Sequence, residues 1–138
     1  MDINYVAVLI ATIADFVIGA IWYMPIFGNL WGKIHGFDKL SKKEQEEARK
    51  GMAPLLAVQM VITFITVLVL AKLQILLPAY SLYSMAFLVW IGFVLPTQIA
   101  AIIFGGTNEK WFVQKALIMA TGSFICLQAA AAILIAFK

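Results

Sequence analysis

The sequence has little of the chemistry that most enzymes and metal-binding proteins use. Its 138 residues include one cysteine, one histidine and only 12% charged residues. Because Cys126 is alone, the sequence excludes an internal disulfide and a cysteine-based zinc cluster. His35 lies beside a glycine, with no cysteine or carboxylate cluster near it in the sequence, so we expect no metal site and no cofactor.

No short motif of catalysis or nucleic-acid binding is present either. The sequence contains no nucleophile-elbow, zinc-metalloprotease or P-loop pattern. The net charge of +3 and the pI near 9.1 are not gathered into a basic helix or an RNA-binding motif. We therefore expect a non-enzymatic protein that does not bind nucleic acid.

The sequence has an excess of apolar side chains. Hydrophobic residues make up 64% of the chain, whereas soluble domains have about 45–50%. A soluble domain of this length has too little interior to bury so many of them, so we expect lipid as the solvent. The first hydrophobic segment has no Lys or Arg before it and no small-residue cleavage site after it. We expect it to be retained as a helix rather than removed as a signal peptide.

Four stretches are long enough to cross a membrane core, which needs about 20 apolar residues. The sequence thus predicts an all-α membrane protein, a single domain over residues 1–138 that forms a bundle of four transmembrane helices. Pro25 ends the first helix, Pro54 lies in the first turn of the second, and Gly105 ends the third. The predicted spans are roughly 5–24, 53–76, 84–104 and 113–137.

A polar segment separates the first two spans and predicts a short cytoplasmic helix of its own. Ser41 is followed three residues later by Glu44, which is the spacing of a capping box. Lys43 and Glu47 are opposite charges at four-residue spacing, and such pairs stabilise helices. Because this helix is polar all round, we expect a water-exposed connector, and docking of a partner is the alternative.

The distribution of positive charge predicts the orientation in the membrane. Eight Lys and Arg residues flank the spans on one side and two on the other. By the positive-inside rule, the first and third loops are cytoplasmic and both termini are non-cytoplasmic. The eight are Lys33, Lys39, Lys42, Lys43, Arg49, Lys50, Lys110 and Lys115, and the two are Lys72 and Lys138. The expected inner aromatic belt comprises Trp22, Tyr23, Trp31 and Trp111, and the outer belt Tyr5, Tyr80 and Tyr83.

Two motifs resemble a known family. Residues 19–31 read Gly-Ala-Ile-Trp-Tyr-Met-Pro-Ile-Phe-Gly-Asn-Leu-Trp, and Trp90-Ile-Gly-Phe is followed by Phe104-Gly105 ahead of the last span. Over nearly the whole chain, the sequence resembles the prokaryotic membrane family called domain of unknown function 1761. The resemblance implies a multi-pass protein of the prokaryotic plasma (inner) membrane, and it implies no activity and no catalytic residues. Residues 116–118, Ala-Leu-Ile, depart from the family's tendency to a small–aromatic pair.

Asp15 is the first candidate site residue, because it lies near the middle of the first span. An acid at this depth is costly, so it should face the bundle interior and mark a functional site. Ala7, Ala11 and Gly19 recur with it at four-residue spacing and form a stripe of small side chains. Such stripes let helices approach closely, which predicts that Asp15 is buried between helices rather than facing lipid.

Counting residues from the ends of the spans predicts two polar layers. Asp15 and Gln128 should lie at similar depth in mid-membrane, and Gln59 and Gln98 at similar depth nearer the cytoplasm. Trp90 lies slightly outward of Asp15, and its indole N–H is a candidate donor to the carboxyl group. Two interpretations stay open. Either Asp15 is protonated and donates to Gln128, so that the layers only hold helices together, or Asp15 titrates and binds a proton or another cation.

These features leave three hypotheses for the function. The first is a binding or transport unit for a small solute or ion, surrounded by membrane lipids and working as a homo-oligomer. Small-residue faces such as residues 129–132 favour such association. The alternative is an accessory or scaffold subunit of a larger membrane complex. The third is a membrane enzyme acting on a lipid, for which the sequence presents no active site.

Overall fold

The computed structural model describes residues 2–138, and the secondary structure of this part of the chain is entirely helical. Four helical segments are long and apolar enough to cross a membrane, with 22, 35, 23 and 28 residues. They are Tyr5–Ile26, Lys42–Leu76, Leu82–Phe104 and Glu109–Ala136. All four predicted spans are therefore present as helices, and the second begins well before its predicted start.

Two of these segments contain a π-helical turn, and a tryptophan begins each turn. In the first segment, α1 (Tyr5–Ile21) continues into the π turn η1 (Trp22–Ile26), which contains Pro25. In the third, α4 (Leu82–Val89) leads through the π turn η3 (Trp90–Val94) into α5 (Leu95–Phe104). Proline lacks a backbone N–H and disrupts regular α-helical pairing around it. Isolated π turns of this kind are frequent at functional sites.

The polar segment after the first span forms more helix than the sequence predicts. Helix α2 (Gly28–Ile34) and the short 3-10 turn η2 (Phe37–Lys39) come first. Helix α3 then runs without interruption from Lys42 to Leu76. The predicted capping box is confirmed: the Glu44 N–H donates to Ser41 Oγ at 3.2 Å, and the Ser41 N–H donates to Glu44 Oε2 at 2.9 Å.

The prediction of a separate polar helix is wrong, and so is the placing of Pro54 in a first turn. Pro54 lies inside the 35-residue helix α3. Its missing N–H would have paired with the carbonyl of Lys50, four residues back, among charged residues where water can replace the donor. Gly51 is only a weak helix breaker. Nothing at the junction is therefore strong enough to end the helix.

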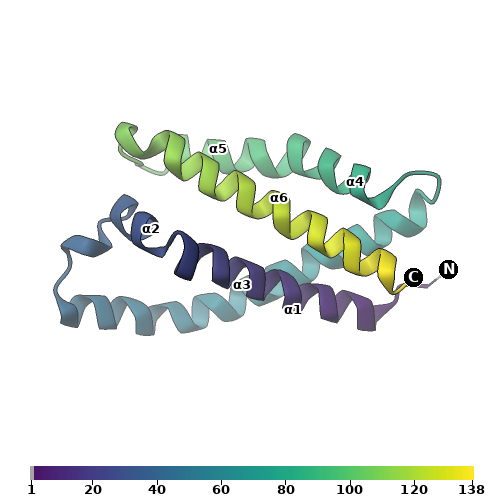
Figure 1. Cartoon of the computed structure of the whole chain (residues 1–138), viewed down its shortest axis with the longest axis horizontal. Coiled ribbons are helices and arrows are strands. Elements are labelled where there is room, and N and C mark those ends of the chain that lie inside the picture. Colours follow the sequence, from purple (N-terminus) through teal and green to yellow (C-terminus); the bar gives the residue numbers. More distant parts are fainter. Residues whose placement is uncertain (1) are drawn as a thin grey trace.

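Helix α6 (Phe112–Ala136), which follows the 3-10 turn η4 (Glu109–Trp111), lies at the centre of the packing. It contacts α1, α4, α5 and, less extensively, α3 (Figure 1). The core uses small side chains, and Ala130 and Ala131 of α6 are fully buried at 0% exposure. Residues 129–132 were predicted to be an exposed face for association, but Ala130 and Ala131 are buried and residues 129 and 132 are half-buried, so this face is not free.

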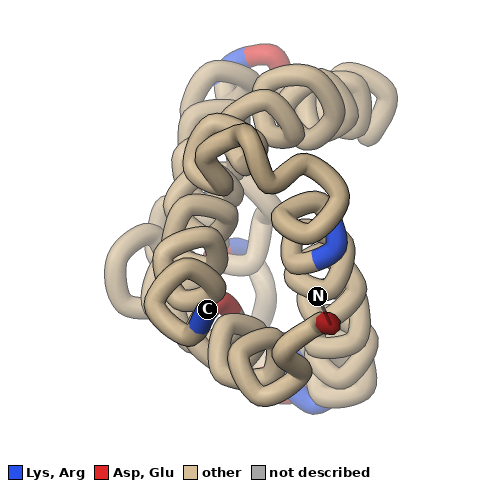
Figure 2. The backbone as a smooth tube through the Cα atoms, turned by 90° about the vertical axis from the view of Figure 1, so that its right-hand side faces the viewer, with Lys and Arg blue, Asp and Glu red and all other residues tan. Residues whose placement is uncertain are grey.

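Both chain termini lie at the same end of the molecule, beside the α3–α4 turn (Figure 1). The side-chain amide of Asn4 donates to the carbonyl of Phe137 at 2.9 Å and ties the two termini together. We call this the terminal end. We call the opposite end, with α2, η2, the start of α3 and η4, the basic end, because it holds the eight Lys and Arg residues of the predicted inner side. Figure 2 shows that charge is sparse along the helices.

Candidate functional site

Three side chains from different elements donate hydrogen bonds to three consecutive backbone carbonyls of α6. The indole N–H of Trp22, in η1, donates to the Ile118 carbonyl at 2.9 Å. The Gln98 amide, in α5, donates to the Met119 carbonyl at 3.3 Å, and the Trp90 indole, in η3, donates to the Ala120 carbonyl at 3.0 Å. We call Trp22, Gln98 and Trp90 with these carbonyls the α6 clamp. A carbonyl oxygen has two lone pairs, so it can accept these bonds beside its helical bond.

Close approach at the clamp depends on Gly122, which is buried in α6 one turn beyond Ile118. A Cβ atom added to Gly122 would lie 2.8 Å from both Cδ1 and Nε1 of Trp22. Only hydrogen atoms at this position leave room for the indole against the helix backbone. Trp22 is half-buried here. The sequence predicts Trp22 only as a residue of the inner aromatic belt. A belt pattern does not indicate which helix a tryptophan contacts, so the contact of Trp22 with α6 was not predicted.

The clamp continues into a small polar network between α5 and α6. The Trp90 indole N–H also lies 3.1 Å from the Ser123 hydroxyl. That hydroxyl has two acceptors within reach, the Ala120 carbonyl at 3.0 Å and the Gln98 side-chain oxygen at 3.2 Å. The Trp90 ring packs against Phe124, with centroids 5.1 Å apart. The prediction that Trp90 reaches the Asp15 carboxyl is wrong, because its N–H is directed to α6 instead.

Asp15 lies inside the molecule, with 6% of its surface exposed. Its carboxyl oxygen Oδ1 is buried and has no hydrogen-bond partner among the described residues. The Cys126 thiol of α6 lies 3.7 Å from the backbone carbonyl of Asp15. The hydroxyl of the neighbouring Thr12 donates a hydrogen bond to the Val8 carbonyl at 2.7 Å. The small-residue stripe is largely internal, since Ala7 and Ala11 have 1% and 0% exposure.

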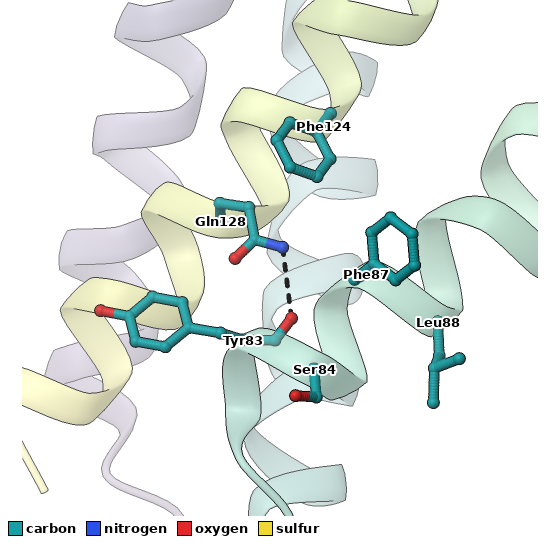
Figure 3. Close-up of a pocket in the computed structure, with 6 residues that line it drawn as sticks. All are labelled: Tyr83, Ser84, Phe87, Leu88, Phe124 and Gln128. Atoms are coloured by element: carbon teal, nitrogen blue, oxygen red, sulfur yellow. Dashed lines mark hydrogen bonds between the residues drawn. The ribbon is translucent and has the colours of Figure 1, made fainter.

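Gln128 does not meet Asp15, so the predicted pairing of these two residues is wrong. Its side-chain amide donates to the Tyr83 carbonyl of α4 at 3.2 Å. Figure 3 shows Gln128 pointing to α4 beside an open groove of about 530 Å³, away from α1. The groove is lined by Tyr83, Ser84, Phe87, Leu88, Phe124 and Gln128. Counting residues from the ends of the spans predicts similar depths for Asp15 and Gln128, but it does not predict the side of α6 on which Gln128 lies.

Gln59 and Gln98 do not form the predicted inner layer. The Gln59 side chain is exposed on α3, and its amide donates to the Thr63 hydroxyl of the same helix at 3.4 Å. Gln98 instead belongs to the α6 clamp. A polar layer does exist around Gln98, but its other members are Trp90 and Ser123, and Ser123 was not among the predicted residues.

A second cavity lies at the basic end, between η1, α2, η2 and α3, with a volume of about 570 Å³. Arg49 lies over the Phe37 ring, 5.5 Å from its centroid, and the Gln45 amide donates to the Phe37 carbonyl at 3.1 Å. The lining residues are Tyr23, Met24, Gly28, Asn29, Gly32, Lys33, Phe37, Asp38, Gln45 and Arg49. We call this the basic-end pocket. The sequence interpretation did not identify it, because its lining residues come from four separate elements.

His35 stays apart from other potential metal ligands. Its ring nitrogen Nδ1 lies 2.8 Å from the Trp31 carbonyl, and the two rings pack with centroids 4.4 Å apart. Within residues 2–138, no group of three or more His, Cys, Asp or Glu side chains is placed to hold a metal ion. His35 therefore packs at the end of α2 against its own helix.

A comparison with protein families matches nearly the whole chain. Residues 6–135 match the family model described as protein of unknown function (DUF1761). This confirms the resemblance carried by residues 19–31 and the Trp90 motif. No curated protein and no solved structure matches the sequence.

Proposed function

We propose that this chain, which belongs to the family of proteins of unknown function DUF1761, is a small non-enzymatic transport unit of the prokaryotic plasma membrane. It crosses the membrane four times, works as a homo-oligomer, and moves a small solute or ion with the binding and release of a proton at Asp15. The observation that carries the proposal is the buried, unpartnered carboxyl oxygen of Asp15 in an apolar span.

An unsatisfied acid inside a membrane span needs an explanation, because acids are rare there and mark ion and proton pathways by default. Asp15 has 6% exposure, and its Oδ1 has no donor among the described residues. An acid kept only to hold helices together would be expected to use its hydrogen-bonding capacity on a neighbouring helix. A free oxygen at this depth is instead suited to a ligand that comes and goes.

The proton is the cation that this site fits. A bare metal ion such as Ca²⁺ takes about six to eight oxygen ligands, whereas a proton needs one acceptor oxygen. Asp15 supplies one carboxylate, and the Thr12 hydroxyl beside it is engaged with the Val8 carbonyl. The Cys126 thiol lies against the Asp15 backbone rather than its carboxyl group. These contacts support binding of a proton at Asp15.

Association into a homo-oligomer is supported by polar side chains that face outward at membrane depth. All residues from 51 to 59 of α3 are exposed, and Gln59 is among them. A glutamine amide has two N–H donors and one acceptor, which is more than Thr63 can satisfy. Thr66 and Thr97 are also exposed, but their hydroxyls donate to carbonyls one turn back in their own helical segments, so Gln59 is the unsatisfied group. A polar group left unpaired in lipid is costly, so a second copy packed on α3 is the proposed partner of Gln59.

The direction of insertion follows from charge. The basic end holds eight of the ten Lys and Arg residues, so we propose that it faces the cytoplasm. The terminal end, where Asn4 bonds to Phe137, then faces the opposite side, with both termini non-cytoplasmic.

Proton movement is testable in liposomes that contain the purified protein and an entrapped pH-sensitive dye. With a potassium diffusion potential as the driving force, the wild-type protein is expected to acidify or alkalinise the lumen faster than empty liposomes. Asp15→Asn keeps the size of the side chain but removes the exchangeable carboxyl proton, so its flux is expected to fall to the level of empty liposomes.

A control is available in a second polar residue of an apolar helix. Gln128→Leu removes a polar group that points toward α4 rather than toward Asp15, and its flux is expected to stay within twofold of wild type. If wild-type liposomes conduct no faster than empty ones under either direction of the potential, the transport proposal is wrong. Equal proton flux in wild type and Asp15→Asn would show that Asp15 is not required for proton movement.

The homo-oligomer is testable by sedimentation equilibrium in detergent. The protein mass of the wild-type complex is expected to be at least twice the 15.2 kDa of one chain. Gln59→Leu is expected to weaken self-association about 3- to 18-fold for each hydrogen bond lost, from about 0.6–1.7 kcal/mol per bond. Gln74→Leu, on the same helix near the terminal end, is the control and should have no effect.

Two results would contradict this arrangement. A wild-type protein that sediments as a monomer at all concentrations would exclude a stable homo-oligomer. Purification in a fixed ratio with another membrane protein would favour the alternative, an accessory subunit of a larger complex, for which the same exposed face of α3 would be the docking surface.

A further inference from the structure

We infer that the basic-end pocket binds the phosphate group of an anionic phospholipid. This inference concerns a different part of the molecule from Asp15 and does not depend on the proposed transport. The pocket has a volume of about 570 Å³, which is enough for a phospholipid head group. Gly28 and Gly32 lie at four-residue spacing on α2 and present no side chains to it.

The charge of the lining favours an anion. Lys33 and Arg49 contribute two positive charges and Asp38 one negative charge, which gives the lining a net charge of +1. Asn29 supplies a further side-chain N–H donor. Arginine binds phosphate with two parallel N–H donors, and lysine acts as a point charge. Basic pockets between helices at this level of a membrane protein bind lipid head groups.

The apolar part of the lining favours a lipid over free phosphate. Tyr23, Met24 and Phe37 line the same cavity as the two cations. Such a wall contacts the glycerol and the first methylene groups of a phospholipid, whereas inorganic phosphate gains nothing from it. Met24 is 64% exposed, which leaves its side chain free for such a contact.

The position of the pocket matches the level of lipid head groups. Tyr23 and Met24 belong to the last turn of the first membrane-spanning segment, which ends at Ile26. Lys33 lies in α2, which follows just beyond that end, and Figure 1 shows α2 at the end of the molecule opposite the two termini. A phospholipid beside the first span would therefore bring its phosphate to the cations while its chains stay in the membrane.

The test measures retained lipid by native mass spectrometry. Wild-type protein in mixed micelles with phosphatidylglycerol and phosphatidylcholine is expected to retain phosphatidylglycerol preferentially. Arg49→Gln should lower this retention about fivefold. Lys50→Gln changes the net charge equally at a neighbouring position outside the pocket lining, and it should lower retention much less than Arg49→Gln does. Gly32→Leu fills the pocket without changing charge, and it should lower retention as Arg49→Gln does.

A competition with inorganic phosphate distinguishes the sources of the phosphate group. Retention that survives millimolar phosphate supports the lipid head group, and displacement by phosphate at that level supports a water-soluble phosphate ligand in the same pocket. Equal retention of the two lipids by wild type would overturn the inference. Equal losses of phosphatidylglycerol retention in Arg49→Gln and Lys50→Gln would also overturn it. So would full retention of phosphatidylglycerol by Gly32→Leu, provided that this variant elutes from gel filtration as the wild type does.

Discussion

Replacing Gly122 with alanine is expected to lower the free energy of unfolding by about 1–3 kcal/mol. The new Cβ would lie 2.8 Å from two atoms of the Trp22 indole, which is closer than real carbon contacts allow. The indole would have to move away from α6. It would then lose its 2.9 Å hydrogen bond to the Ile118 carbonyl. Thermal or denaturant unfolding in detergent measures the change.

Gly19→Ala provides the control for this substitution. A Cβ atom at Gly19 meets nothing within 4 Å, and alanine is a better helix former than glycine by about 1 kcal/mol. This variant is therefore expected to be as stable as wild type or more stable. Combining Gly122→Ala with Trp22→Leu should cost less than the sum of the two single changes. Strict additivity in that double-mutant cycle would show that the steric explanation is wrong.

Replacing Trp90 with alanine is expected to lower the free energy of unfolding by about 3 kcal/mol, the lower end of the range for removing a large ring from a core, because Trp90 is half-buried. The ring packs against both Phe124 and Phe87, with centroids 5.1 and 6.1 Å away. The same change removes the donor to Ala120 and Ser123. The loss should be visible as a lower midpoint of unfolding in the same detergent.

Trp90→Phe separates the packing of Trp90 from its hydrogen bonds. It keeps an aromatic ring beside Phe124 and removes only the N–H donor, so we expect a loss of about 0.6–1.7 kcal/mol. Ser123→Ala, which removes one acceptor of that N–H, should cost a similar amount. If Trp90→Phe destabilised the protein as much as Trp90→Ala, hydrogen bonding rather than ring packing would be the main contribution of this residue.

The four helices that are long and apolar enough to span a membrane were predictable, because the length of such a helix follows from the thickness of a bilayer. Their boundaries were less accurate where two signals competed. Pro54 predicts a helix start, but the helix begins at the capping box of Ser41 and Pro54 lies within it. A proline marks a first turn only when no stronger start lies upstream. Both π turns have a proline in or just after them, Pro25 inside η1 and Pro96 two residues beyond η3. The disruption of regular helical pairing at these places was therefore predictable, but its π-helical form was not.

In the candidate site, the burial of Asp15 was predictable, whereas the direction of Gln128 was not. Asp15 is buried as the small-residue stripe indicates, because a stripe at four-residue spacing defines one face of a helix. Gln128 has no such stripe to place it, and it points to α4. Ser123 was missed because a serine in an apolar helix ordinarily bonds its own backbone. Its place beside Gln98 depends on how α5 packs against α6.

The uninterrupted helix α3 has a mechanical consequence. Its 35 residues extend about 52 Å at about 1.5 Å per residue, so it is a single rod from beyond the basic-end pocket to the terminal end. Arg49 and Gln59 are both carried on this rod. Pro54 lies between them, where one backbone hydrogen bond is missing, and is therefore the point at which the rod bends most easily. Bending at Pro54 would change the position of Gln59 relative to Arg49 without ending the helix.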